Sequence, residues 1–140
     1  MKLPRVLFVC VGNACRSQMA EGFARAYGKD VMTSESAGLS PAMAIPKETV
    51  ETMTEKNIDV SGQVPKPVNI FPPGYFDFVV NLSGRPIPGF PAATEWKVRD
   101  PIGGSPAEYR AARDQIERLV MNLIVELRRQ SNQLKSATRK

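Results

Sequence analysis

The chain has 140 residues, 42% of them apolar and 24% charged, a composition that fits one folded domain and excludes a disordered or fibrous protein. It contains no histidine, which excludes a Cys–His pair and a zinc site built on imidazole, so we expect neither a metal nor a cofactor. The net charge is +5, but Lys135, Arg139 and Lys140 in the polar tail supply three of these units, and we expect no nucleic-acid-binding surface.

The apolar segments and the cysteines of the sequence indicate the cellular compartment of the protein. No apolar run reaches membrane-spanning length, so we expect no membrane association, and the amino terminus has no cleavable apolar leader. Two cysteines cannot build a disulfide framework, whereas a reducing compartment suits a reactive thiol. The sequence therefore predicts a cytoplasmic protein.

The first predicted elements are a strand, a tight loop and a helix in direct succession. The apolar run 6–9 predicts the strand, residues 10–17 form the loop, and residues 18–27 are helix-like. A loop that enters a helix amino terminus turns several backbone N–H groups towards one point, where the helix dipole adds partial positive charge. We therefore expect an oxyanion-binding cup lined by Val11, Gly12, Asn13, Ala14, Cys15, Arg16 and Ser17.

Cys10 lies where the floor of this cup would be. Inward-pointing donors, the helix end and Arg16 all favour the thiolate over the thiol, and a thiolate under an oxyanion is a nucleophile. The planar guanidinium of Arg16 would bind two oxygens at once, and Ser17 would donate to the sulfur or cap the helix. The alternative is a buried core cysteine at a strand end, which would leave Arg16 and the Gly12–Asn13 turn unexplained.

The remaining elements predict a single three-layer α/β domain with a four-stranded parallel sheet flanked by helices. Further strands are expected at 31–38, 76–82 and 94–98, with the last at an edge, a short helix at 46–57, and mostly loop at 61–75. Ser105 and Glu108 form a capping box that begins a long helix ending near residue 130. Residues 1–130 would thus be the catalytic domain and 131–140 a frayed basic tail.

Asp100 is the candidate general acid. It follows the predicted edge strand, and Pro101 restricts it to an extended conformation that aims its side chain. If the sheet order brings this strand end beside Cys10, the carboxyl group can protonate a leaving oxygen and later deprotonate water. The alternative is an Asp-Pro turn cap.

Cys15 leaves two possibilities open. It could trap a sulfenic acid on Cys10 as a disulfide, which is a redox role, or it could be a small buried residue that packs the loop.

Together, the run Cys10-Val11-Gly12-Asn13-Ala14-Cys15-Arg16-Ser17 and the pair Asp100-Pro101 resemble the low-molecular-weight protein tyrosine phosphatases and their relatives, the thioredoxin-coupled arsenate reductases. The resemblance covers about residues 4–130. It implies a phosphocysteine intermediate on Cys10, oxyanion binding by Arg16 and the loop N–H groups, and Asp100 as the acid. Asn13 and Ser17 match positions that order the loop.

The resemblance supports two branches. Residues 18–22 resemble the reductases, but the reductase relay needs two further cysteines, and Ser83 stands where the first would be. Phosphatases that take phosphotyrosine usually carry aromatic residues at two places, where this chain has Ala42 and Met43, and Ile102 and Gly103. We expect a phosphomonoester hydrolase acting on a phosphorylated small molecule or protein. The alternatives are an arsenate reductase that uses an external thiol donor and a non-catalytic oxyanion-binding module.

Overall fold

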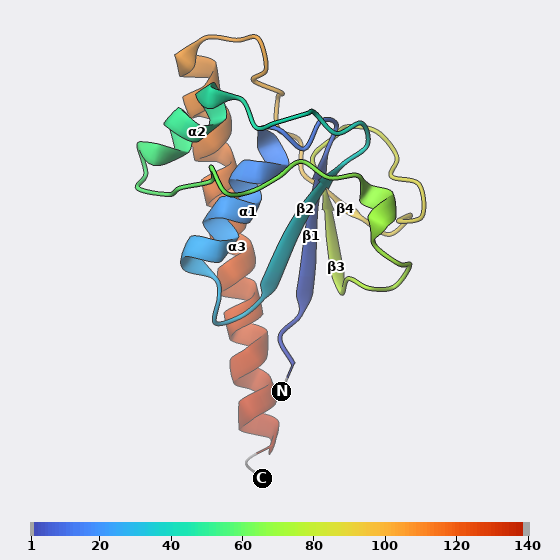
Figure 1. Ribbon diagram of the computed structural model, residues 1–140. Coiled ribbons are helices and arrows are strands. Elements are labelled where there is room, and N and C mark those ends of the chain that lie inside the picture. Colours follow the sequence, from blue (N-terminus) through green and yellow to red (C-terminus); the bar gives the residue numbers. More distant parts are fainter. Residues whose placement is uncertain (1, 139–140) are drawn as a thin grey trace.

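The computed structural model describes residues 2–138, which form one α/β domain (Figure 1). The elements in chain order are β1 (Arg5–Cys10), α1 (Arg16–Tyr27), β2 (Thr33–Gly38), α2 (Lys47–Thr54), a 3-10 turn (Val68–Ile70), β3 (Phe78–Asn81), β4 (Thr94–Glu95) and α3 (Pro106–Thr138). Within the described residues, no helix is long and apolar enough to cross a membrane.

The four strands form one parallel sheet in the order β2-β1-β3-β4, which confirms the predicted fold class. β1 lies inside the sheet, and Val6, Leu7, Phe8 and Val9 are fully buried. The register pairs Cys10 with Gly38 of β2 and Val9 with Asn81 of β3. The carboxyl ends of three strands therefore meet at one edge, which is where ligands bind in open parallel sheets.

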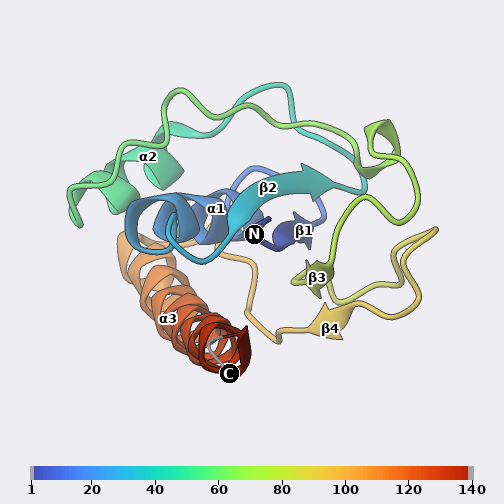
Figure 2. The ribbon, with the colours of Figure 1, turned by 90° about the horizontal axis from the view of Figure 1, so that it is seen from below.

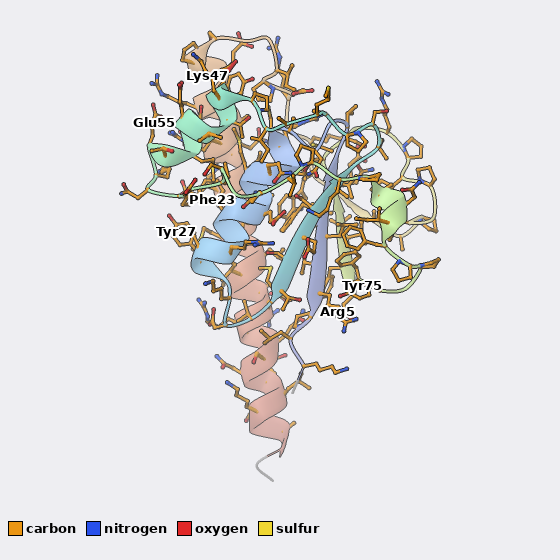
Figure 3. All side chains as sticks on the ribbon, in the orientation of Figure 1. Arg5, Phe23, Tyr27, Lys47, Glu55 and Tyr75 are labelled. Carbon is orange, nitrogen blue, oxygen red and sulfur yellow. The ribbon has the colours of Figure 1, made fainter. Side chains whose placement is uncertain are left out.

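The two faces of the sheet are covered differently (Figure 2). The three α-helices pack on one side, where Phe8, Phe23 and Met53 belong to the larger apolar core. In Figure 3, Phe23 and Tyr27 extend from successive turns of α1, and their rings stack 6.1 Å apart. On the other side, loops and the 3-10 turn supply the cover, with Val68 and Ile87 packed on Leu7 and Val9.

α3 begins as predicted but ends later. Ser105 and Glu108 form the capping box, with the Glu108 N–H donating to Ser105 Oγ at 3.3 Å. The predicted end near residue 130 is wrong, because the helix continues to Thr138 and its carboxyl-terminal part extends beyond the sheet (Figure 1). This stretch contains no glycine or proline to end the helix, and Leu134 lines a hollow together with Leu3. Residues 139–140 of the predicted frayed tail lie outside the described residues.

The strands towards the β4 edge are shorter than the sequence indicates. The apolar run 76–82 forms a strand only from Phe78 to Asn81, and Phe78 is 40% exposed instead of covered on both faces. The predicted strand 94–98 is reduced to Thr94–Glu95. Beyond it the chain stays close to the sheet through the Trp96 N–H, which donates to the Asn81 carbonyl, but it forms no further ladder. Among the described residues, the only neighbour of β4 is β3, which ends at Asn81 opposite Glu95, so residues 97 and 98 have no strand to pair with.

Candidate active site

The loop between β1 and α1 forms the floor of the site. Cys10 ends β1 and is 3% exposed, and α1 begins at Arg16. Cys15, the N-cap residue of α1, makes no capping hydrogen bond with its side chain. The first N–H groups of the helix are therefore not bound by this side chain. The backbone N–H groups of Val11 to Ser17 are the donors available at this helix end.

A second loop lies against the first one. The N–H groups of Leu39, Ser40 and Ala42 donate to the carbonyl groups of Cys10, Val11 and Gly12, at 3.2, 2.8 and 2.9 Å. Gly38 permits this approach, because a Cβ at that position would lie 2.9 Å from the Asn13 N and the Val11 O atoms. These bonds orient the loop carbonyl groups outwards, which leaves the opposite side of the loop for its N–H groups.

Asn13 and Ser17 connect the loop to the Cys10 sulfur. Asn13 has the left-handed backbone conformation expected from the sequence, with φ of 49°, and its Nδ2 atom donates to Ser17 Oγ at 2.7 Å. Ser17 Oγ lies 2.9 Å from Cys10 Sγ. Because Asn13 already donates to this oxygen, the hydroxyl proton is free to point at the sulfur, where it stabilises a thiolate. Of the two roles predicted for Ser17, the structure has the contact with sulfur and no helix cap.

Arg16 extends from α1 to the strand ends on the other side of the loop. Its Nη1 atom donates to the carbonyl groups of Leu82, at 2.5 Å, and Val98, at 3.1 Å. Its Nη2 atom lies 3.4 Å from Asp100 Oδ2. Arg16 is 6% exposed, so two carbonyl groups and one carboxylate compensate a nearly buried charge.

Asp100 lies beside the loop, as the sheet order predicts. Its Oδ1 atom accepts a hydrogen bond from the Ile102 N–H at 3.1 Å, and its side chain is 45% exposed. The distance of 3.4 Å to Arg16 exceeds the usual length of a charge-assisted hydrogen bond, so a bound oxyanion can compete for the guanidinium. The structure thus brings Cys10, Arg16 and Asp100 to one edge of the sheet.

Cys15 is as buried as Cys10 but has different hydrogen-bond partners. It is 2% exposed, it accepts a hydrogen bond from Thr49 Oγ1 at 3.0 Å, and its Sγ atom lies 3.8 Å from the Tyr109 hydroxyl. Burial raises the pKa of the Cys15 thiol to about 11, against the opposing effect of the Thr49 hydrogen bond. This thiol is therefore protonated near neutral pH, which favours the packing role over the redox role.

The residues that support Asn13 were not identified from the sequence. The Lys66 N–H donates to Asn13 Oδ1 at 2.9 Å, and the Lys66 carbonyl accepts from the Gly38 N–H at 2.8 Å. Gln18 Nε2 donates to the Asn13 carbonyl at 3.0 Å, and Gln63 Nε2 donates to Gln18 Oε1 at 2.6 Å. The segment 63–66 therefore holds the loop from outside, although its prolines indicated only an irregular connection.

A buried carboxylate lies next to this segment. Glu21 of α1 is 1% exposed, accepts a hydrogen bond from Ser36 Oγ and pairs with Arg25 at 2.6 Å. Its other cationic neighbour is the Lys66 ammonium group at 4.0 Å. Among residues 2–138, no three side chains of His, Cys, Asp or Glu gather as a metal site.

Comparisons with known proteins agree with this geometry. The sequence matches the profile of the family described as low molecular weight phosphotyrosine protein phosphatase over residues 5–133. It is 35% identical to the glutaredoxin arsenate reductase of Synechocystis sp. over 131 residues, which cover 89% of this chain and 99% of that protein. It is 32% identical to an arsenate reductase of Bacillus cereus, over 79% of this chain and 87% of the relative.

The structural similarity is equally extensive. An arsenate reductase solved in the phosphate-binding state superposes with a TM-score of 0.82 at 34% identity, covering 89% of this chain and 99% of that one. These relatives bear the name of the alternative in the sequence analysis, the arsenate reductase, and not that of the phosphatase expected first. The chain belongs to the low molecular weight phosphotyrosine protein phosphatase family.

Proposed function

We propose that this protein is an arsenate reductase that takes its second thiol from an external donor. One observation carries the proposal: Cys10, supported by Ser17, shares a sheet edge with the Arg16–Asp100 pair, while the other thiol of the chain, Cys15, is bound by Thr49 and has a raised pKa. The names of the relatives support the choice of arsenate over a phosphate ester.

The first step is substitution at arsenic. The Cys10 thiolate attacks the arsenic atom of arsenate, an S–As bond forms, and one oxygen leaves as water after Asp100 donates a proton to it. Arg16 and the loop N–H groups from Val11 to Ser17 bind the remaining oxygens, and they stabilise negative charge as it develops. In this state the oxyanion competes with Asp100 for the Arg16 Nη2 atom, and protonated Asp100 releases that contact.

The second step is the reduction. An external thiolate attacks Cys10 Sγ, so that an S–S bond forms, the S–As bond breaks, and its electron pair stays on arsenic, which leaves as arsenite. A second external thiol then frees Cys10 by thiol–disulfide exchange. The two electrons gained by arsenic come from Cys10 and the first donor, and two donor molecules are oxidised to one disulfide over the cycle. Cys15 does not supply the thiolate because burial holds its pKa at about 11.

Phosphate-ester hydrolysis is the second candidate function, and the small number of cysteines in the chain favours it. The chain has two cysteines, Cys10 and Cys15, so it has no internal thiol relay of the kind expected for the reductase branch. Asp100 beside Arg16 would protonate the leaving oxygen of an ester and then deprotonate the water that cleaves a phosphocysteine. Either activity places the protein in a reducing compartment, consistent with the cytoplasm.

One experiment separates these activities. Purified protein is given arsenate with glutathione, and in parallel an aryl phosphate, with Cys10→Ser as the control in both assays. Arsenite formation that is lost in Cys10→Ser supports the reductase. Hydrolysis of the aryl phosphate without arsenite formation identifies a phosphatase. Phosphate binding with neither turnover identifies a non-catalytic oxyanion-binding module.

A further inference from the structure

A hollow of about 340 Å³ lies directly beside Arg16, on the side of β3 and β4. Its buried lining residues are Arg16, Leu82 and Val98, and its exposed ones are Gly84, Glu95, Lys97 and Arg99. Trp96, the remaining lining residue, is held in place because its ring packs on Phe8, with centroids 5.8 Å apart. This volume is in the range of small-molecule sites and is too small for a protein domain.

Arg16 belongs to the oxyanion loop and also lines the hollow, and the Leu82 backbone connects the two. β3 runs parallel to β1, and its pairing of Asn81 with Val9 brings Leu82 level with the end of β1. The Leu82 N–H donates to the carbonyl of Val9, the residue before Cys10, at 2.7 Å. The Leu82 carbonyl in turn accepts from Arg16 at 2.5 Å. A molecule bound in the hollow is therefore next to the Arg16 guanidinium, whose Nη2 atom lies 3.4 Å from Asp100.

The charges around the hollow favour an anion. Arg16, Lys97 and Arg99 contribute three positive charges against the single carboxylate of Glu95. Within residues 2–138, neither Lys97 nor Arg99 has an acidic partner, whereas the Arg16 charge is shared with Asp100. Two exposed cations without partners at the edge of a small concave site suit a ligand that carries carboxylates.

We propose that this hollow binds the external donor, and that the donor is a small thiol bearing carboxylates, such as glutathione. This inference rests on the proposed reductase function, which needs a thiol that the chain does not contain. Ser83, in the loop beside the hollow, has a hydroxyl group where a relay would need sulfur. Lys97 and Arg99 bind the donor carboxylates, and the donor thiolate forms the S–S bond with Cys10 as arsenite leaves.

The test uses thiol exchange at Cys10 without arsenate. Cys10 is converted to its mixed disulfide with 2-thiopyridine in a Cys15→Ala background, and release of the thiopyridone is followed with glutathione, β-mercaptoethanol and cysteamine. Each rate is divided by the rate of the same thiol with a small thiopyridyl disulfide, which removes intrinsic reactivity. We expect the corrected glutathione rate to exceed that of β-mercaptoethanol by about tenfold and to saturate, with cysteamine slowest.

Charge reversal locates the effect. Lys97→Glu and Arg99→Glu should each lower the corrected glutathione rate by about three- to tenfold and leave the β-mercaptoethanol rate unchanged. Lys29→Glu, in the turn before β2 at the opposite end of the sheet, makes the same change in net charge and should leave both rates unchanged. Equal corrected rates for the three thiols, or equal effects of all three substitutions, would overturn the proposed thiol site.

A binding measurement supports the kinetics and separates the two proposals. S-methylglutathione, which cannot exchange, should shift the NMR signal of the Trp96 side chain in the unmodified protein but not in Lys97→Glu. Absence of this shift in both proteins counts against the site. Absence of arsenite formation with every thiol, together with selective exchange, contradicts the reductase function and leaves the thiol site standing.

Discussion

Asn13→Ala tests the connection between the loop conformation and the reactive sulfur. The substitution removes the hydrogen bond to Ser17 Oγ and leaves the Lys66 N–H without its acceptor. Each lost bond costs about 1 kcal/mol, and alanine at a φ of 49° adds roughly 1 kcal/mol of backbone strain. We therefore expect Asn13→Ala to lower the free energy of unfolding by about 3 kcal/mol.

Asn13→Gly is the matched control, because glycine adopts the left-handed conformation without this strain. It loses the same side-chain hydrogen bonds, so its expected destabilisation is about 2 kcal/mol. Urea unfolding followed by the fluorescence of Trp96, the single tryptophan, measures both values. In both variants Ser17 loses the donor that directs its proton to sulfur, and arsenate turnover should fall about tenfold. An Asn13→Ala protein within 0.5 kcal/mol of the wild type, with full turnover, would refute this reasoning.

Three further predictions concern the other residues of the site. Arg16→Lys keeps the charge, but a lysine cannot contact two carbonyl groups and Asp100 together. The value of kcat/KM for arsenate should therefore fall more than about 100-fold, and a loss of less than about tenfold would show that charge alone suffices. Asp100→Asn should lower the rate of the first step about 100-fold in a rapid-quench assay while inorganic phosphate still binds, and an unchanged rate would exclude it as the acid. The third prediction concerns Cys15, whose pKa is raised to about 11 from an ordinary value of 9.0, so the folded protein keeps a proton that the unfolded chain releases. This contribution to the free energy of unfolding is complete below pH 9 and is lost as the pH rises to 11. Urea unfolding should therefore show the wild type losing about 2–3 kcal/mol more stability than Cys15→Ala over this window. Parallel pH profiles of the two proteins would contradict the raised pKa of Cys15.

The local part of the site could be predicted from the sequence because its determinants are adjacent in the chain. An apolar strand, a left-handed turn at Asn13 and a helix that begins at Arg16, two residues before the predicted start, fix the loop within a dozen residues. The contact between Arg16 and Asp100 depends on sheet order, and the parallel crossover pattern was enough to place both at one edge.

Features that depend on contacts distant in the chain were missed. Lys66 and Gln63 support Asn13 and Gln18 from a segment about fifty residues away, and no periodicity marks them. The two roles of Cys15 could not be separated until its neighbours Thr49 and Tyr109 were known.

The lengths of the edge elements were also not predictable from local pattern. β4 pairs with β3, which ends at Asn81 opposite Glu95, so the alternating sequence of residues 94–98 does not form a full strand. In α3 the buried face includes Val120 and Ile124, while Leu119 and Leu123 are half-buried.

The central claim is that the Cys10 sulfur bonds to arsenic and is then released by an external thiol. The direct measurement is a single-turnover reaction with excess arsenate and limiting glutathione, quenched in acid and analysed for arsenite and for the state of Cys10 by mass spectrometry. We predict arsenite in equal amount to a Cys10–glutathione disulfide, and neither product in Cys10→Ser. Arsenite absent with every thiol tested, while Cys10 hydrolyses an aryl phosphate, would contradict the account.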